Sequence, residues 1–498
     1  MRNGSESAGT RRCLLGLLFG LSFISNAYFL ANFGSPNSIS RAALSVAMIE
    51  HGTVAIDPLA DLAEDRAVRD GHYYSDKAPG MSFVALPVAA VFIALVNPGH
   101  DDRLWHGEGG ISVAFGALIA VSALLISSLL TAISVPLLYR AISQLGGSAA
   151  CAAVIALVYA HATPIWLWAA AFYGHSVAAA LLVTGMHALL RTASGGPYSQ
   201  RWALWSGFSL AWAVLVEFTA AVPVLILLAF ALTRLAENGR LWRSMCLVAL
   251  GGLPVLCLLL AYNTAAFGGP FSIGYAYSDG YDAMQSGFYG LSAPSLSVLA
   301  EITLGDRHGI LWLSPVLALV PIGFALSLIS SQWRSIGAHC GSVVAYYFLL
   351  NSGYAYWDGG YSTGPRHVTA SMPFACLLLA CLWERGRVAR YALLGLGGLS
   401  GLICLIAVAV NIAMPNDLDL SMAEFLLPRF WQGQFDNGVA NLLGQLGWTR
   451  LTPLLPLLIV WVLGLVALIR LIRLEAGETM LPRGIPAGGA SGTIGSNR

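Results

Sequence analysis

One short segment combines an acid, a cation and the start of an apolar run. Residues 74–80 read YSDKAPG and close a long polar stretch. Pro79 suits the first turn of a helix and keeps the preceding residue extended, so Asp76 and Lys77 are held beside the positive end of that helix. A cation, free backbone amides and a helix dipole together favour an anion such as a lipid phosphate. The alternative is that Lys77 is only an interfacial anchor, but the loop holds seven carboxylates and four basic residues. This charge density favours a function, with Asp76 as the acid-base group.

The same stretch offers further candidates. Glu50 and Asp57 are alternative bases, and Arg41 is an additional contact for a phosphate. The loop is acidic enough to attract a divalent cation, but its acids lack the spacing of a cation-binding loop. No metal ligands are therefore predicted, and a divalent cation stays open as a cofactor.

Two later polar segments place Arg and His together at expected helix starts. They are residues 305–309 (GDRHG) and 354–367 (YAYWDGGYSTGPRH). Glycine permits close approach of a ligand to the backbone, and arginine binds phosphate through two parallel hydrogen bonds. The alternatives are an aromatic belt and an exposed interfacial arginine. The predicted donor-binding residues are Lys77, Arg41, Arg307, Arg366 and His367, and the predicted pocket residues are Tyr73, Tyr74, Trp357, Asp358 and Asp306.

Four ionisable residues lie inside apolar runs: His161, His175, His187 and Glu217. Such residues usually face the interior of a bundle or a cavity. Glu217 falls in the middle of its run, where it could mark a kink. His175 is expected near the cytoplasmic end of its helix, where a structural role is favoured.

Membrane-spanning helices must position these segments. The 498 residues are 57% hydrophobic and 10% charged, whereas soluble domains carry about 25% charged residues. The pattern predicts an all-α, polytopic integral membrane protein with about twelve transmembrane helices. A net charge of +1 offers no footprint for nucleic acid, and all eight cysteines lie in or beside apolar runs, as packing residues do. The expected spans are 13–31, 81–96, 111–138, 149–162, 176–190, 202–232, 241–265, 310–328, 340–350, 368–382, 393–412 and 451–471. The first is expected to be a retained helix rather than a cleaved signal peptide.

The distribution of arginine sets the orientation. A cytoplasmic N-terminus puts most loop arginines inside, as inner-membrane proteins require, and leaves Arg140, Arg191 and Arg201 outside as exceptions. Treating 202–232 as one helix keeps the cluster at 385–390 inside. This topology gives one membrane domain, 1–474, with a cytoplasmic, disordered tail at 475–498. Its four long outer loops are 33–80, 267–308, 351–367 and 414–450, and we expect function on that face.

Three segments resemble one enzyme family. Residues 74–80 are similar to the acid-Lys-Pro-Pro-like motif that ends the first outer loop in polytopic glycosyltransferases of the C superfamily, including the aminoarabinose transferases that modify lipid A. Residues 207–219 are similar to another part of the same superfamily, and residues 357–366 resemble a segment of relatives of protein mannosyltransferases. The resemblance implies a large first outer loop with amphipathic juxtamembrane helices. It also implies transfer of a sugar from a polyprenyl-phosphate donor to a lipid, glycan or protein acceptor at the outer face of the bacterial inner membrane.

One departure from that family concerns the base. The acid of the family follows the first helix within a few residues, whereas no carboxylate precedes Glu50 here. Two other functions stay open: an Arg- and His-dependent ligase or polymerase of lipid-linked glycans, and a transporter or lipid flippase without bond chemistry.

Overall fold

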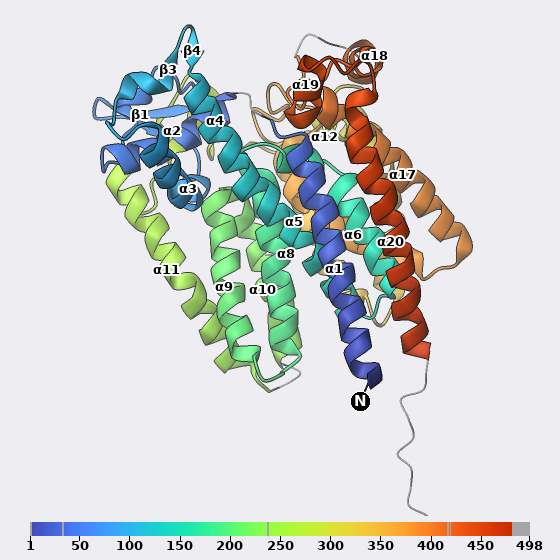
Figure 1. Ribbon diagram of the computed structural model, residues 1–498. Helices are drawn as coiled ribbons and strands as arrows, with labels where there is room; N and C mark the ends of the chain where they lie inside the picture. Colours follow the sequence, from blue (N-terminus) through green and yellow to red (C-terminus); the bar gives the residue numbers. More distant parts are fainter. Residues whose placement is uncertain (1, 32–33, 237–238, 416–417, 419, 481–498) are drawn as a thin grey trace, which may run out of the picture.

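The computed structural model describes residues 2–31, 34–236, 239–415, 418 and 420–480, and these form an almost purely helical bundle (Figure 1). The predicted fold class is confirmed. The helices of the first half are α1 (Arg2–Tyr28), α2 (Pro36–Glu50), α3 (Gly80–Val96), α4 (Val113–Ser122), α5 (Leu129–Gln144), α6 (Ala149–His161), α7 (Ile165–Ala169), α8 (Gly174–Ala193), α9 (Ser199–Val216) and α10 (Ala221–Ala236). Those of the second half are α11 (Leu241–Phe267), α12 (Leu296–Leu304), α13 (Ile310–Leu313), α14 (Val320–Ile329), α15 (Arg334–Ser352), α16 (Met372–Trp383), α17 (Arg387–Val410), α18 (Leu427–Gln432), α19 (Gly438–Gln445) and α20 (Leu455–Met480).

Apolar length identifies the membrane-crossing part. Within the described residues, seven helices are long and apolar enough to span a membrane: Val113–Gln144, Gly174–Ala193, Phe218–Ala236, Leu241–Phe267, Arg366–Trp383, Arg387–Val410 and Thr452–Glu475. Shorter apolar helices cover Gly80–Val96, Ala149–His161 and Pro315–Ile329. Of the residues in Arg366–Trp383, 89% are buried, whereas in the most apolar 18-residue stretch of Leu241–Phe267 only 11% are buried. The first is therefore central, and the second presents its apolar surface outward, as a lipid-facing helix does.

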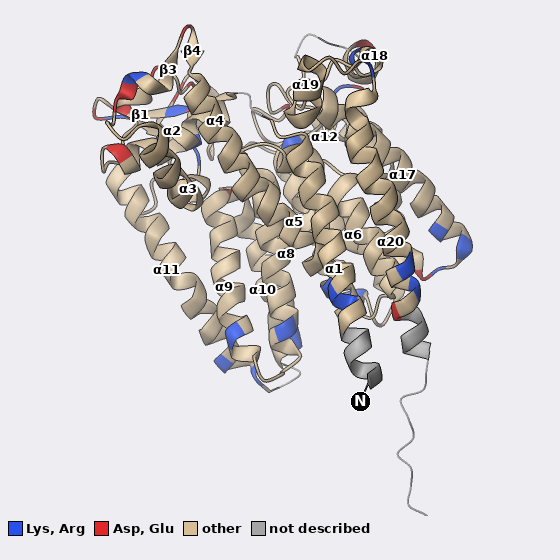
Figure 2. Cartoon of the chain, viewed as in Figure 1, with Lys and Arg blue, Asp and Glu red and all other residues tan. Residues whose placement is uncertain are grey.

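The bundle has two chemically different ends. We call one the terminal end, because the first and last helices, α1 and α20, begin and end there: Arg11 Nε lies 2.8 Å from Glu475 Oε1, and the Tyr139 hydroxyl donates to Glu475 Oε2 at 2.8 Å. We call the opposite end the loop end. Figure 2 shows basic residues at the lower ends of α1, α9 and α10 and acidic residues around β1, at the top.

The loop end joins polar segments that are distant in sequence. One small sheet has the strand order β2-β1-β5, where β1 (Arg66–Arg69) pairs antiparallel with both β2 (His72–Ser75) and β5 (Ser278–Asp279). A second sheet is the hairpin of β3 (His106–Gly107) and β4 (Gly110–Ile111). An isolated bridge links Leu291 to Tyr354, and the amide of Thr363 donates to the Ile412 carbonyl at 3.0 Å. These hydrogen bonds connect the four long polar segments to one another.

The expected second span, 81–96, does not cross the bundle. It forms α3, whose two ends both contact α2: Arg41 donates to the carbonyl just before α3, that of Ala78, at 3.3 Å, and Asn97, just after α3, donates to Glu50 at 2.6 Å. The β3–β4 hairpin follows at the loop end (Figure 1), and α4 begins there. The first loop-end segment therefore continues to Ser112 instead of ending at Gly80. Its predicted first residue, 33, lies outside the described residues.

The expected single helix at 202–232 is two helices. The helix α9 ends at Val216, Glu217 is extended at φ −144° and ψ 114°, and a 3-10 turn, η4 (Phe218–Ala220), leads into α10. A Cβ on Gly195, before α9, would lie 1.8 Å from Nη1 of Arg240, after α10. Both helices thus reach the terminal end, and the break at Glu217 lies at the loop end.

The number of spans is nevertheless as predicted, because the span wrongly expected at 81–96 is offset by the second helix found within 202–232. In the described part of the chain, twelve helical segments connect the two ends: α1, α4–α5, α6, α8, α9, α10, α11, the turn η7 (Pro315–Leu319) with α14, α15, the turn η8 (Arg366–Ser371) with α16, α17, and the turn η10 (Thr452–Leu454) with α20. The segments between the two errors run opposite to expectation. The helix α5 continues from α4 through a π-helical segment, η3 (Ala123–Ser128), and ends at the terminal end.

Because these helices run opposite to expectation, the three arginines that violated the predicted positive-inside pattern change sides. A cavity of about 400 Å³ at the terminal end is lined by Arg11 together with Arg140, Arg191 and Trp202. Arg201 is adjacent to Trp202 and stacks over Tyr198. The three arginines expected outside therefore lie at the same end as the N-terminus. At the C-terminus, α20 continues to Met480, beyond the expected boundary at 474, and residues 481–498 of the expected tail lie outside the described residues.

Candidate functional site

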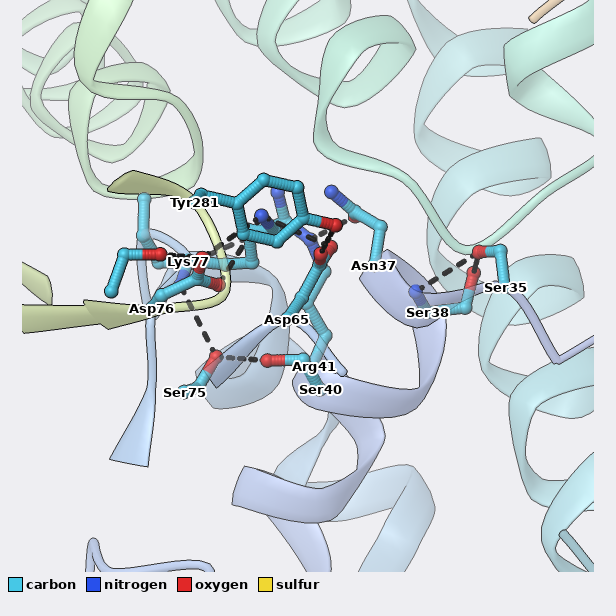
Figure 3. A network of polar contacts seen from close by, with 12 residues as sticks. Ser35, Asn37, Ser38, Ser40, Arg41, Asp65, Ser75, Asp76, Lys77 and Tyr281 are labelled. Carbon is cyan, nitrogen blue, oxygen red and sulfur yellow. Dashed lines mark hydrogen bonds and ion pairs between the residues drawn. The ribbon is translucent and has the colours of Figure 1, made fainter. Parts of the chain in front are cut away.

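Lys77 is the centre of a buried ion cluster at the loop end (Figure 3). Its Nζ lies 3.0 Å from Asp65 Oδ2 and 3.2 Å from Asp76 Oδ1. The side chains are 10%, 7% and 0% exposed, in the order Lys77, Asp65, Asp76. Lys77 is also the only lysine among the 498 residues. Lysine is a strongly hydrated surface residue, so a single buried one indicates a specific task.

Neighbouring elements hold the cluster together. The Tyr281 hydroxyl donates to Asp65 Oδ1 at 2.9 Å, and the Ser278 hydroxyl donates to Asp76 Oδ2 at 3.4 Å. Both residues belong to the second polar segment, which β5 attaches to β1. A Cβ on Gly274 would lie 2.8 Å from the Cα of Asp76, so only glycine lets this segment pass so close.

Burial and charge shift the pKa values of Asp65 and Asp76 in opposite directions. For Asp65, burial favours the neutral form, but the charge and hydrogen bond of Lys77 outweigh it and lower the pKa. For Asp76, burial dominates over the attraction of Lys77, and the negative charge of Asp65 adds to it, so the pKa rises to about 6. Burial opposes the charge of Lys77, yet both acids together raise its pKa. At neutral pH, Lys77 and Asp65 are charged, and Asp76 titrates just below that pH.

A second ion pair lies beside the first. Arg41 Nη2 lies 3.1 Å from Glu217 Oε1, and Arg41 Nε donates to Asn37 Oδ1 at 2.8 Å. The residue after Lys77, Ala78, accepts from Arg41 Nη1. His175 Nδ1 is 3.6 Å from the same Glu217 oxygen. Arg41 thus links the break between α9 and α10 to the start of α3.

Arg366 differs from Lys77 and Arg41 because no acid among the described residues forms an ion pair with it. Among the described residues it has no ion pair, its Nε has no hydrogen-bond partner, and its guanidinium lies 5.5 Å from the centre of the Tyr173 ring. Gly359 has φ +71°, and a Cβ there would lie 2.8 Å from Arg366 Nε. The ring of the next residue, His367, is 5.6 Å from that of His175 and 5.4 Å from that of Tyr354. The predicted pair Arg366-His367 therefore faces the same region as Glu217 and His175.

Other predicted site residues are held elsewhere. Glu50 accepts from Asn97 and Trp105, and it lies nine residues along α2 from Arg41, about 13 Å of helix rise. Asp57 accepts from His72 and from the backbone amide of Tyr73. Neither contacts Lys77, so the structure places both predicted alternative bases away from the cluster.

The predicted aromatic pocket residues are also divided. Tyr73 lies under Arg66, Tyr74 packs against Phe267, and Trp357 packs against His308 at 5.7 Å. Burial lowers the pKa of His308 to about 4, with Arg307 adding to the shift and Asp358 opposing it. Asp306 is exposed. The second predicted pair, Arg307-His308, thus forms a separate group with Trp357 and Asp358.

Three functional candidates were missed by sequence reasoning. Asp65 looked like one of many loop acids, and Tyr281 like part of an aromatic belt. His175 was expected at the cytoplasmic end in a structural role, but it lies at the loop end beside Glu217 because α8 runs in the opposite direction. His161 and His187 do have structural surroundings: His161 packs between Trp166 and Trp461, and His187 against Trp202.

A cation has one possible group of ligands in the described residues. Glu50, His51 and Asp102 each offer an atom, all within 4.8 Å of one another. This group lies at the C-terminal end of α2, away from Lys77, and both Glu50 oxygens already accept hydrogen bonds.

Comparisons with known proteins identify the fold. No family profile and no curated protein matches the sequence. The structure is similar to the crystal structure of ArnT from Cupriavidus metallidurans bound to undecaprenyl phosphate, with a TM-score of 0.50 and 14% identity over 94% of this chain and 74% of that one. The same protein in its apo state gives 0.48 and 15% over 95% and 78%. The archaeal oligosaccharyltransferase AglB from Archaeoglobus fulgidus, in complex with an inhibitory peptide and a dolichol-phosphate, gives 0.46 and 9% over 82% and 56%. The match to ArnT confirms the predicted fold, an ArnT-like bundle of membrane helices.

Proposed function

We propose that this protein is a membrane glycosyltransferase that moves a sugar from a polyprenyl-phosphate donor to a lipid, glycan or protein acceptor. We further propose that the loop end faces the outer side of the bacterial inner membrane. The fold supports the class of enzyme, since the ArnT structure with this fold holds undecaprenyl phosphate. The arginines gathered at the terminal end support the orientation.

Arg366 is the observation that carries the proposal. A partly buried guanidinium without an acidic partner is costly unless an anion completes it. Arg366 begins the central helix segment, and glycine at position 359 makes room for it. A phosphodiester there would gain two charge-assisted hydrogen bonds. Lys77 would add a second positive charge, which is strongest while Asp76 is protonated.

Transfer of the sugar requires three contributions from the protein. A base must take the proton of the acceptor hydroxyl, cations must stabilise the departing lipid phosphate, and the site must fix both reactants. Arg366 and Lys77 are suited to stabilise the departing lipid phosphate. Asp76, the predicted base, is 0% exposed, so no acceptor hydroxyl reaches it in this conformation. We assign Asp76 to holding Lys77 in place.

One observation favours the Arg- and His-dependent ligase as a second candidate. Both ring nitrogens of His308 and Nε2 of His367 are buried and accept or donate no hydrogen bond within the part of the chain that the structure describes. A ligase acting through these histidines would lose activity when they are replaced and would tolerate replacement of every loop-end carboxylate. Transport has less support, because Glu217, the only acid expected at mid-membrane depth, pairs with Arg41 at the loop end.

Binding of undecaprenyl phosphate tests the proposal. The protein would be reconstituted in nanodiscs and titrated with this lipid, with bound lipid counted by native mass spectrometry. We expect saturable binding that Arg366→Ala weakens about tenfold or more, as loss of a bidentate charged contact does. Arg103→Ala is the matched control, because Arg103 is 91% exposed and pairs only with Asp101. Equal binding by both variants, or none by the wild type, would overturn the proposal.

A further inference from the structure

Glu217 is a buried carboxylate to which the proposed function has not yet given a task. It lies where α9 breaks off and α10 begins, at the loop end of two apolar helices. Ionisable residues in such places are costly and usually mark a functional site. Pro223, in the first turn of α10, cannot donate to the Thr219 carbonyl and therefore favours a break just before α10. This break places the Glu217 carboxylate at the loop end.

The surroundings of Glu217 keep one oxygen occupied and the other available. Oε1 is engaged by Arg41 Nη2 at 3.1 Å and faces His175 Nδ1 at 3.6 Å. Oε2 accepts no hydrogen bond from the described residues. It is not fully enclosed by protein atoms, and the side chain as a whole is 12% exposed. Gly174 makes room for this arrangement, because a Cβ there would lie 2.1 Å from Oε1.

Comparison with the other acids singles Glu217 out. Asp76 is fully enclosed, and both oxygens of Asp65 are already engaged by Lys77 and Tyr281. The positive charges of Arg41, Lys77 and Arg366 all act on Glu217, so it lies close to the proposed phosphate contacts. Asn37 stands at the start of α2 and contacts the same guanidinium of Arg41. Arg41 is therefore shared by an amide from the first polar segment and a carboxylate from a distant helix.

We infer that Glu217 is the catalytic base of the proposed transfer. Its Oε2 accepts the proton of the acceptor hydroxyl as that oxygen forms a bond to the anomeric carbon of the sugar. The bond between the anomeric carbon and the phosphate oxygen breaks, and the lipid phosphate leaves with the electron pair, beside Arg366 and Lys77. The proton then passes from Glu217 to the released lipid phosphate or to water. Arg41 is a positioning residue that aligns Glu217 with the start of α3.

This inference rests on the proposed function, and azide separates the two. Azide is already an anion, so it attacks the anomeric carbon without a base. Nanodisc-embedded protein would receive a panel of undecaprenyl-phosphate-linked hexoses and pentoses, with cell-envelope lipids or with sodium azide as the acceptor. Products would be identified by mass spectrometry.

Glu217→Gln should lower transfer to hydroxyl acceptors by about 10²–10⁴-fold, the usual contribution of a general base. It should keep the binding of undecaprenyl phosphate and form the glycosyl azide as fast as the wild type does. Arg366→Ala should lose both reactions, because it acts on the leaving group. Glu301→Gln on α12, a glutamate without an ion pair among the described residues, is the matched control and should keep both reactions.

Each other result has one meaning. Normal transfer to hydroxyl acceptors by Glu217→Gln would overturn the inference and leave the proposed function intact. Loss of both hydroxyl and azide reactions with intact lipid binding would also overturn it, since a structural role would explain that loss. If Glu217→Gln fails to insert into the membrane, Glu217→Asp takes its place and should slow only the hydroxyl reaction. A wild type that neither binds undecaprenyl phosphate nor transfers any sugar would refute the proposed function itself.

Discussion

Replacing Lys77 by methionine removes the ammonium but keeps an unbranched side chain of similar length. The variant leaves Asp65 and Asp76 without the cation that separates them, in a place where they are 7% and 0% exposed. Breaking a buried ion pair on one side costs about 3–5 kcal/mol. We expect a loss of this size in the free energy of unfolding at pH 8.

The loss should depend on pH in a definite direction. In the wild type the pKa of Asp76 is raised from 3.8 to about 6, so folding takes up a proton between these values and this group makes stability fall as pH rises through that window. The lowered pKa of Asp65 acts in the opposite direction and gives stability above its unfolded value. Without Lys77, the pKa of both acids rises. Protonation of Asp76 then stabilises the variant up to a higher pH than in the wild type, by about 1.4 kcal/mol for each unit by which its pKa rises. The penalty of Lys77→Met should therefore be smaller at pH 5.5 than at pH 8.

Tryptophan fluorescence during denaturant titration in detergent micelles would measure this difference. Arg103→Met is the control, because Arg103 is exposed and its loss should not change the pH dependence. The double variant Lys77→Met with Asp76→Asn should recover part of the loss at pH 8. Equal penalties at both pH values would refute the reasoning, because they would mean that the two acids do not share one buried site with Lys77.

Three further predictions follow from the same geometry. The sequence has one lysine, and its pKa is raised. An amine reagent at pH 8.5 should therefore modify the N-terminus quickly and Lys77 slowly, as followed by peptide mass spectrometry, and Asp65→Asn should speed the modification of Lys77. Equal rates of Lys77 modification in the wild type and Asp65→Asn would contradict this. Gly174→Ala should displace the Glu217 carboxylate, because a Cβ at position 174 would lie 2.1 Å from Glu217 Oε1. The rate of sugar transfer should fall at least tenfold while membrane insertion stays normal. Gly9→Ala is the control: a Cβ there meets open space, so the rate of transfer should not change. An impermeant thiol reagent on intact spheroplasts should label Arg103→Cys and spare Arg191→Cys, in a background without native cysteines; the reverse labelling would invert the proposed orientation.

Local signals in the sequence predicted both helix starts of the site. Pro79 restricts its neighbours, and the helix α3 does begin at Gly80; the turn η8 likewise begins at Arg366, directly after Pro365. Both signals act within a few residues of the cation that they place. The same local reasoning could not recognise α3 as a helix that stays at one end. Its apolar run has the composition of a short span, and only the contacts of Ala78 and Asn97 with α2 decide the matter.

The break at Glu217 had one local signal, Pro223 six residues further on, whereas the ion-pair partner of Glu217, Arg41, is 176 residues away. Counting residues 81–96 as a span reversed the helices after it and put His175 at the wrong end, and treating 202–232 as one helix restored the expected direction of the later helices. One signal pointed to the error: Arg140, Arg191 and Arg201 all violated the charge pattern in the same part of the chain. A second signal, the single lysine, was available from composition alone and marks the centre of the cluster.

The central claim is that Arg366 and Lys77 hold the phosphate of a lipid-linked sugar at the loop end. Cryo-electron microscopy of the protein in nanodiscs with undecaprenyl phosphate tests it most directly. We predict phosphate density at hydrogen-bond distance from the Arg366 guanidinium, about 3 Å, with Lys77 on its other side and Glu217 facing the open space beside it. Phosphate density bound elsewhere, with Arg366 still without an anion, would contradict the account.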